Sequence, residues 1–139
     1  MSRIMGLDVG KKTIGVAVSD PLLLTAEPLK TIWRKKFSDD LEELKKIILK
    51  YDITKIVVGL PKNMDNSISS SAQRVISFVD LLKKNLNIDI FYQDERLTTS
   101  LSEQVLMKMN VRRENRKKYI DKIAASFILD TFLQENYNG

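Results

Sequence analysis

The chain has 139 residues and a hydrophobic content of 43%, which favours a single compact domain over residues 1–139. The chain contains no cysteine and no histidine. This excludes disulfides, thiolate or imidazole metal ligands, and cysteine or histidine catalytic groups. Any catalysis must then depend on carboxylates, hydroxyls, lysines or hard cations bound by oxygen ligands. The net charge of +5 favours an anionic partner, with ordinary solubilising charge as an equal alternative.

The sequence has no long apolar run and no signal-peptide pattern, which favours a cytoplasmic protein without membrane segments.

The first third of the chain is predicted to begin with three strands. Residues 4–9 and 13–19 are short runs rich in β-branched residues, separated by Gly-Lys-Lys, and this pattern predicts a hairpin. Residues 29–33 form the third predicted strand. From Ser38, a predicted N-cap, apolar residues recur at helical spacing as far as Tyr51, so a helix follows.

The remainder alternates between helices and strands. Residues 55–58 and 88–92 are predicted strands, separated by a helix over 72–86. A helix is expected after Ser100, then a charged loop with the sequence RRENRKK. A last helix is expected over 120–132, with one apolar side made of Ile120, Ile123, Ala124, Phe127, Ile128 and Phe132. The order predicts an α/β domain in which a five-stranded mixed sheet, an antiparallel meander joined to parallel strands, is flanked by helices.

Three acidic residues are expected at one edge of this sheet. Right-handed crossovers make the first, fourth and fifth strands parallel, so their carboxyl ends share an edge, where open α/β sheets usually bind ligands. Asp8 ends the first strand, Glu95 follows the fifth and Asp121 opens the last helix. The small Ala124 and Ala125 would let that helix approach the sheet closely.

Carboxylates that share a space while ionised need cations between them. Oxygen ligands without histidine or cysteine select Mg²⁺ or Mn²⁺, and two such ions about 3.5–4 Å apart can hold the reacting oxygens of a phosphodiester. Each acid also has a structural interpretation on its own: Asp8 as a turn former, Glu95 as part of a salt-bridged strand end, and Asp121 as a partner of the helix dipole. Their convergence favours the metal site.

Basic residues border the same edge and are candidates for contacts to nucleic-acid phosphates, with solvated surface charge as the alternative. Lys11 and Lys12 occupy the hairpin turn, and Arg96 follows the acid after the fifth strand. A second cluster leads into Asp121 and consists of Arg112, Arg113, Arg116, Lys117 and Lys118.

Four successive stretches, GLDVGKKTIGVAVSD, IVVGLPKNMDNS, DERLTTS and IDKIAASFIL, resemble the motifs of the YqgF family, whose members are described as pre-16S rRNA nucleases or as Holliday junction resolvases. The resemblance runs from Ile4 to Leu133 and implies a ribonuclease H-like fold with a metal-dependent nuclease site. Carried over by motif, Asp8, Glu95 and Asp121 are its catalytic and metal-binding acids.

The chain departs from related sequences at three places. Lys11 stands where many members have Thr, and Asn66 where many have Gly. Resolvases of the RuvC type carry an acid at the end of the fourth strand, where this chain has Gly-Leu-Pro at residues 59–61. Glu95 would therefore supply that ligand from the neighbouring strand.

The resemblance implies a cytoplasmic endonuclease that uses Mg²⁺ or Mn²⁺ and processes the 5′ end of pre-16S rRNA. RNA is favoured over DNA as the substrate. The expected partners are ribosomal precursor particles, and the expected oligomeric state is a monomer or a homodimer. One alternative is a Holliday junction resolvase acting on four-way DNA as a dimer. Another is a non-catalytic nucleic-acid-binding assembly factor. The first motif also resembles the phosphate loop of actin-like sugar kinases, but this chain is long enough for only one of their two lobes.

Overall fold

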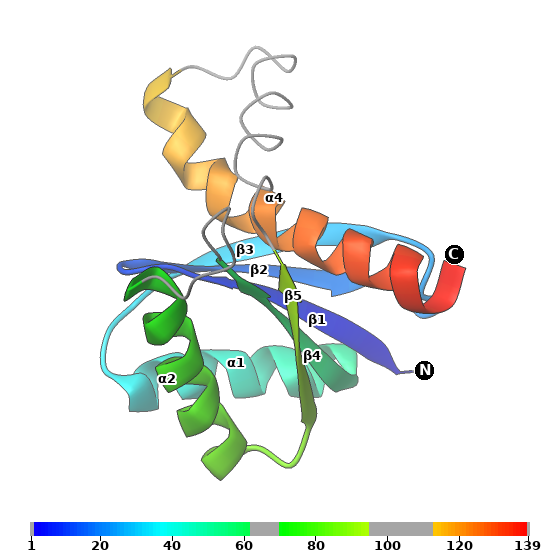
Figure 1. The fold of residues 1–139 in the computed structure, drawn as a ribbon, viewed down its shortest axis with the longest axis horizontal. Coiled ribbons are helices and arrows are strands. Elements are labelled where there is room, and N and C mark those ends of the chain that lie inside the picture. Colours follow the sequence, from blue (N-terminus) through cyan, green and yellow to red (C-terminus); the bar gives the residue numbers. More distant parts are fainter. Residues whose placement is uncertain (1, 62–69, 95–112, 139) are drawn as a thin grey trace.

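A computed structural model describes residues 2–61, 70–94 and 113–138, with the side chains of all of these except 113–121. Figure 1 shows the chain as a sheet with helices on both faces. The elements, in chain order, are β1 (Arg3–Val9), β2 (Thr13–Ser19), β3 (Ala26–Trp33), α1 (Phe37–Tyr51), β4 (Ile53–Leu60), α2 (Ser70–Asn85), β5 (Asp89–Asp94), α4 (Arg113–Leu133) and a π-helical turn, η1 (Gln134–Asn138).

The five strands form one mixed sheet in the order β3-β2-β1-β4-β5. β1 pairs antiparallel with β2, and β2 with β3, whereas β1 pairs parallel with β4, and β4 with β5. The predicted α/β class and the mixed sheet are therefore confirmed. The carboxyl ends of β1, β4 and β5 lie at one edge, as the crossover rule requires.

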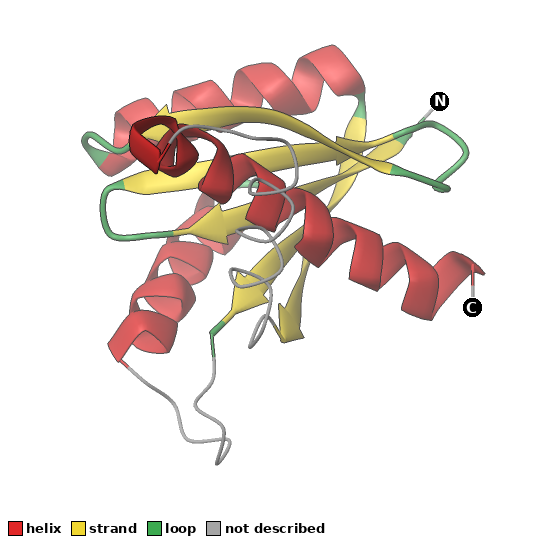
Figure 2. Ribbon diagram, turned by 90° about the horizontal axis from the view of Figure 1, so that it is seen from above, coloured by secondary structure: helices red, strands yellow, loops and turns green. Residues whose placement is uncertain are grey.

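Each face of the sheet has its own apolar core because alternate residues of a strand point to opposite faces. Met5, Leu7 and Val9 are buried in the core beneath α1 and α2. Ile4 is buried in the second core, with Ala17 of β2 and the apolar residues of α4. Figure 2 shows α4 crossing in front of the strands on this second face.

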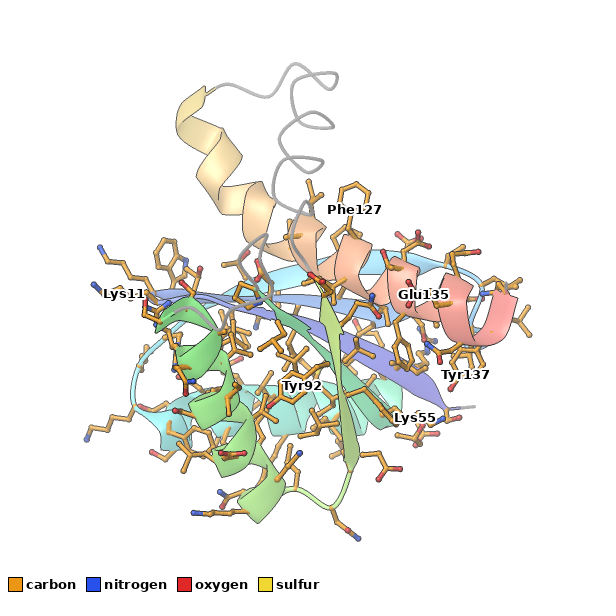
Figure 3. All side chains as sticks on the ribbon, in the orientation of Figure 1. Lys11, Lys55, Tyr92, Phe127, Glu135 and Tyr137 are labelled. Atoms are coloured by element: carbon orange, nitrogen blue, oxygen red, sulfur yellow. The ribbon has the colours of Figure 1, made fainter. Side chains whose placement is uncertain are left out.

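Helix α4 differs from its prediction in its start and in its apolar face. It begins at Arg113, so residues 113–118 are helical rather than a charged loop, because Arg, Glu and Lys are all good helix formers. The prediction that Phe127 belongs to the sheet-facing side is wrong: Phe127 is half-buried and points away from the sheet (Figure 3). The predicted Ala124, Ile128 and Phe132 are buried, and the buried face also includes Ala125, Leu129 and Leu133.

The start of α1 also differs from its prediction. The helix begins at Phe37, with Lys36 at the N-cap position and no hydrogen bond from its side chain to the helix, so the prediction of Ser38 as the N-cap is wrong. The carboxylate of Asp40 organises this end instead, by accepting a hydrogen bond of 3.0 Å from the backbone N–H of Lys35. The helix predicted after Ser100 lies outside the described residues. None of the described helices is long and apolar enough to cross a membrane.

Candidate functional site

Asp8 lies on the face of the sheet that α4 covers. The residues on either side of it, Leu7 and Val9, are buried in the core beneath α1 and α2, so the pleat directs Asp8 to the other face, along with Ile4 and Gly6. The carboxylate is half-buried, near the end of β1. The predicted position of Asp8 at the carboxyl edge of the sheet is confirmed.

Glycines flank Asp8 on both neighbouring strands. Gly15 of β2 is its paired residue in the antiparallel ladder. On the other side, Leu7 pairs with Val58, so the next residues along these parallel strands are Asp8 and Gly59. Because glycine has no side chain, neither of these two positions places one beside the carboxylate. This is the arrangement that a site for a ligand would need.

Helix α4 approaches β1 closely at Gly6. A Cβ atom built at Gly6 would lie 2.8 Å from the Cβ of Leu129 and 2.9 Å from the carbonyl oxygen of Ala125. Real Cβ atoms essentially never make non-bonded contacts this short, so a side chain at Gly6 would force the helix away. The close approach predicted from the small residues of this helix is confirmed, and Gly6 provides the matching space on the strand.

The helix runs antiparallel to β1. Lys55, which pairs with Ile4 near the start of β1, donates a hydrogen bond of 2.7 Å from its Nζ to the Oη of Tyr137, just after α4 (Figure 3). Moving from Ile4 towards Asp8 therefore means moving back along α4. Two residues of strand advance by about 6.6 Å and one helical turn by about 5.4 Å, so position 121, one turn before Ala125, is expected near the level of Asp8.

Strand β5 ends beside this region. Its last residue, Asp94, pairs with Leu60, and Leu60 packs against the core beneath α1 and α2. Asp94 therefore belongs to the face opposite Asp8, and the preceding residue, Gln93, to the face that α4 covers. Glu95 follows directly in the sequence but lies outside the described residues.

Of the three predicted acids, Glu95 and the side chain of Asp121 lie outside the described residues. Among the residues that the structure does describe, no group of three acidic side chains lies close enough together to hold a metal ion. Asp8 is the one predicted ligand whose side chain is placed, and the backbone of α4 places position 121 one turn before Ala125.

The turn between β1 and β2 is fixed from several sides. Its backbone closes through a hydrogen bond of 2.8 Å from the N–H of Gly10 to the carbonyl of Thr13. Arg34, just after β3, donates from Nη1 to the carbonyl of Gly10 (2.7 Å) and from its backbone N–H to the carbonyl of Lys12 (2.9 Å). The turn presents Lys11 and Lys12 as exposed side chains, as predicted.

Arg34 is itself held by a buried acid and an aromatic ring. Its Nε lies 3.9 Å from Oδ2 of Asp40, whose side chain is only 2% exposed. The guanidinium also lies 5.1 Å from the ring centroid of Phe78 on α2. Neither Arg34 nor Asp40 was predicted from the sequence, although an arginine directly after an edge strand and an acid in the first turn of the next helix could have indicated such a pair.

The remaining predicted basic residues are only partly placed. Arg113, Arg116, Lys117 and Lys118 lie on the first turns of α4, which Figure 1 shows rising away from the sheet. Their side chains lie outside the described part of the chain. Arg96, Arg112 and Asn66 lie outside it altogether.

Comparison with known proteins identifies the family. The sequence matches RuvX, a family described as "Holliday junction resolvase", over residues 2–135. A Clostridium botulinum protein named "Putative pre-16S rRNA nuclease" is 48% identical over 131 residues, which cover 94% of this chain and 96% of that protein. A protein with the same name from Clostridium acetobutylicum is 46% identical over 131 residues, covering 94% and 97% respectively.

Solved structures share the fold. RuvC from T. thermophilus in complex with Holliday junction substrate aligns with a TM-score of 0.61 at 11% identity, over 99% of this chain and 97% of that one. The fowlpox virus resolvase in complex with Holliday junction DNA aligns with a TM-score of 0.57 at 16% identity, over 97% and 99%. The ribonuclease H-like fold is confirmed, and with a family match over nearly the whole sequence the chain belongs to the RuvX/YqgF family.

Proposed function

We propose that this protein is a divalent-metal-dependent endonuclease that cleaves pre-16S rRNA, the substrate in the names of its relatives. One observation carries the proposal. Gly6 lets α4 pack closely on β1 at Ala125 and Leu129, and this close packing supports a site shared by Asp8 and position 121, one turn before Ala125. Two acids from distant parts of the chain would then act together at the carboxyl edge of the sheet.

The donor set fits Mg²⁺ or Mn²⁺. Asp8, Glu95 and Asp121 offer only carboxylate oxygens, and the chain has neither histidine nor cysteine to attract softer metals. Two ions of this kind, when bound, would activate a water molecule and stabilise charge on the phosphate. Asp8, which has glycine on both neighbouring strands, would be accessible to these ions. Asp94 belongs to the opposite face and is not part of the set.

The basic residues would hold the nucleic acid through its phosphates. Lys11 and Lys12, fixed by the bonds from Arg34, would contact the backbone next to the acids. Arg96, Arg112 and the basic side chains at the start of α4 would extend this contact. We infer that the chain works as a single domain in the cytoplasm, on ribosomal precursor particles, as a monomer or homodimer.

A cleavage assay on two substrates tests this function. The wild-type protein, Asp8→Asn and Asp94→Asn are each incubated with a pre-16S rRNA leader and with a synthetic four-way DNA junction, in Mg²⁺ or Mn²⁺. We expect the wild type to cut the RNA, Asp8→Asn to lose cleavage while still binding RNA, and Asp94→Asn to remain active. Unchanged cleavage by Asp8→Asn would refute the proposed site.

The family description favours a second function, resolution of Holliday junctions. Symmetric cutting of the four-way junction, with the RNA left intact, would support that function over the first. A resolvase that cuts two strands normally works as a dimer, so a protein that is monomeric when bound to the junction would argue against it. Failure to cut either substrate, together with RNA binding, would favour a non-catalytic assembly factor.

A further inference from the structure

Trp33 is an exposed aromatic side chain at the end of an edge strand. It is the only tryptophan in the chain, it ends β3, and it is 65% exposed. The preceding residue, Ile32, is buried in the core beneath α1 and α2. Burial of a large aromatic ring is strongly favourable, so this exposed tryptophan is a candidate contact for a partner.

The sheet register places Trp33 on the same face as Asp8. Asp8 pairs with Gly15, and Gly15 pairs with Thr31, which gives one row across three strands. Trp33 pairs with Thr13 in the next row on that face. Two strand spacings and two residues of strand separate the backbones of Asp8 and Trp33 by about 12 Å, a distance that a few nucleotides span.

The backbone around Trp33 is held firmly. The residue after it, Arg34, donates its backbone N–H to the carbonyl of Lys12 (2.9 Å) and its side chain to the carbonyl of Gly10 (2.7 Å). One residue later, the N–H of Lys35 donates to the buried carboxylate of Asp40 (3.0 Å). The backbone that carries the ring is thus fixed relative to the turn of β1 and β2, so a ligand would need to order only the side-chain torsions of Trp33.

Exposed lysines lie on the turn beside Trp33 and directly after it in the sequence. Lys11 and Lys12 lie on the adjoining turn, and Figure 3 shows Lys11 pointing outward from it. Lys35 and Lys36 follow Trp33 in the sequence and are also exposed. An aromatic platform among cations is the arrangement by which proteins bind single-stranded nucleic acid, because bases stack on the ring while phosphates contact the charges.

A depression of about 410 Å³ borders Trp33 on its other side, between β3 and α1. Its walls carry both signs of charge: the acids Asp39, Asp40, Glu42 and Glu43 face the lysines Lys30, Lys35 and Lys46, and Glu43 forms an ion pair with Lys30 (3.1 Å). A polyanion is therefore favoured on the lysine-rich side, where the sheet leads to Asp8, and disfavoured in the depression.

We propose that Trp33 is a stacking platform for an unpaired base of the nucleic-acid substrate, a few nucleotides from the phosphate that would be cleaved at the proposed metal site of Asp8. The inference rests on the proposed function for its ligand class, and it adds a specificity: the enzyme recognises a single-stranded segment beside its cleavage position. Trp33 acts in binding and has no part in the chemistry at the acids.

The intrinsic fluorescence of the protein tests the inference directly, because all tryptophan emission comes from this position. Wild-type protein in EDTA, where no cleavage occurs, is titrated with a short single-stranded RNA and with a blunt RNA duplex of the same sequence. We expect the single strand to quench the emission and the duplex to have much less effect. Emission that is unchanged at saturating single-stranded RNA would overturn the proposal.

Variants give a second measurement. Trp33→Ala is expected to weaken binding of the single-stranded RNA about tenfold, and Trp33→Phe to retain most of the affinity. Leu49→Ala, which removes an 86% exposed side chain on α1, is the matched control and should bind like the wild type. Equal affinity of Trp33→Ala and wild type would refute the platform, as would binding of an acidic peptide that competes with RNA and quenches more strongly.

The binding experiments do not depend on catalysis, so they test the role of Trp33 independently of the proposed nuclease activity. Quenching by single-stranded RNA in a protein that cuts nothing supports the platform and refutes the nuclease. Cleavage of RNA by a protein whose emission does not respond supports the nuclease and refutes the platform. Thermal unfolding of each variant verifies that it is folded.

Discussion

The Cβ of Leu129 on α4 occupies the space that a side chain at Gly6 of β1 would need, since a Cβ at Gly6 would lie only 2.8 Å away. Gly6 does not adopt a positive φ, so the backbone itself would accept another residue. Only the closeness of α4 requires glycine at position 6. This contact sets the height of α4 above the sheet, and with it the relation between Asp8 and position 121.

Replacing Gly6 with Ala is therefore expected to impair stability and activity together. The added methyl group meets the backbone oxygen of Ala125 as well as Leu129, and neither can swing aside as the end of a flexible side chain would. Overpacking of this kind costs about 1–3 kcal/mol. Chemical denaturation measures the loss, and an unchanged free energy of unfolding would contradict the close packing of α4 on β1.

Because Asp40 holds Arg34 and the Lys35 amide beside the β1–β2 turn, replacing Asp40 should lower stability strongly, and replacing Asp39 should lower it little. Asp40→Ala removes the acceptor for the Lys35 amide and leaves Arg34 without its acid, a loss of about 1–3 kcal/mol. Asp39→Asn changes an exposed residue and should stay within about 0.5 kcal/mol of the wild type. Equal losses of the free energy of unfolding in the two variants, measured by chemical denaturation, would contradict this role of Asp40.

The lysines of the turn predict a change in salt dependence. If Lys11 and Lys12 contact phosphates, the double alanine variant should bind RNA more weakly and with a shallower slope of log affinity against log salt, by about 0.7 for each lysine on a single strand. Lys83 and Lys84, exposed in the last turn of α2, form the matched control pair. A slope reduced as much by the control pair would show that only net charge matters.

Asp20 predicts a dependence of stability on pH. The backbone N–H of Thr25 contributes most to holding the pKa of its carboxyl below the usual value; slight desolvation opposes this, and the N–H groups of Leu24 and Leu22 add to the lowering. Because the folded-state pKa is depressed, the stabilisation is complete above the unfolded-state pKa of about 3.9 and is lost as pH falls through the folded-state pKa.

Asp20→Asn should therefore have a lower Tm than the wild type near neutral pH, and the difference should shrink as the solution is acidified below about pH 4. Thermal unfolding followed by circular dichroism over this range measures it. A difference in Tm that stays constant with pH would show that the charge on Asp20 does not stabilise the loop.

Much of the fold could be predicted because most of the strands are short runs rich in β-branched residues. Those features are local, and they gave the hairpin, the parallel strands and the edge that carries Asp8. The start of α4 could not be predicted in the same way. Its first turns are charged throughout, without the apolar periodicity that marks a helix packed on a sheet, although each residue favours a helix on its own.

The candidate site shows a similar division. The identity of Asp8 follows from its place at the end of a strand, and its motif agrees. The separation of Asp94 from Asp8 depends on the pleat and on the pairing of Asp94 with Leu60, which only the register reveals. The contact of Arg34 with Gly10 joins residues 24 positions apart, and no local pattern encodes it. Whether Glu95 completes the acids remains a prediction.

Binding of Mn²⁺ tests the central claim most directly, because it reports the convergence of the acids without depending on turnover. Wild-type protein, Asp8→Asn, Asp121→Asn and Asp94→Asn are each titrated with Mn²⁺ by calorimetry in the presence of RNA. If carboxylates of β1 and α4 share the ions, the heat of binding is lost in the first two variants and retained in Asp94→Asn. Retention of wild-type Mn²⁺ affinity by both Asp8→Asn and Asp121→Asn would contradict the account.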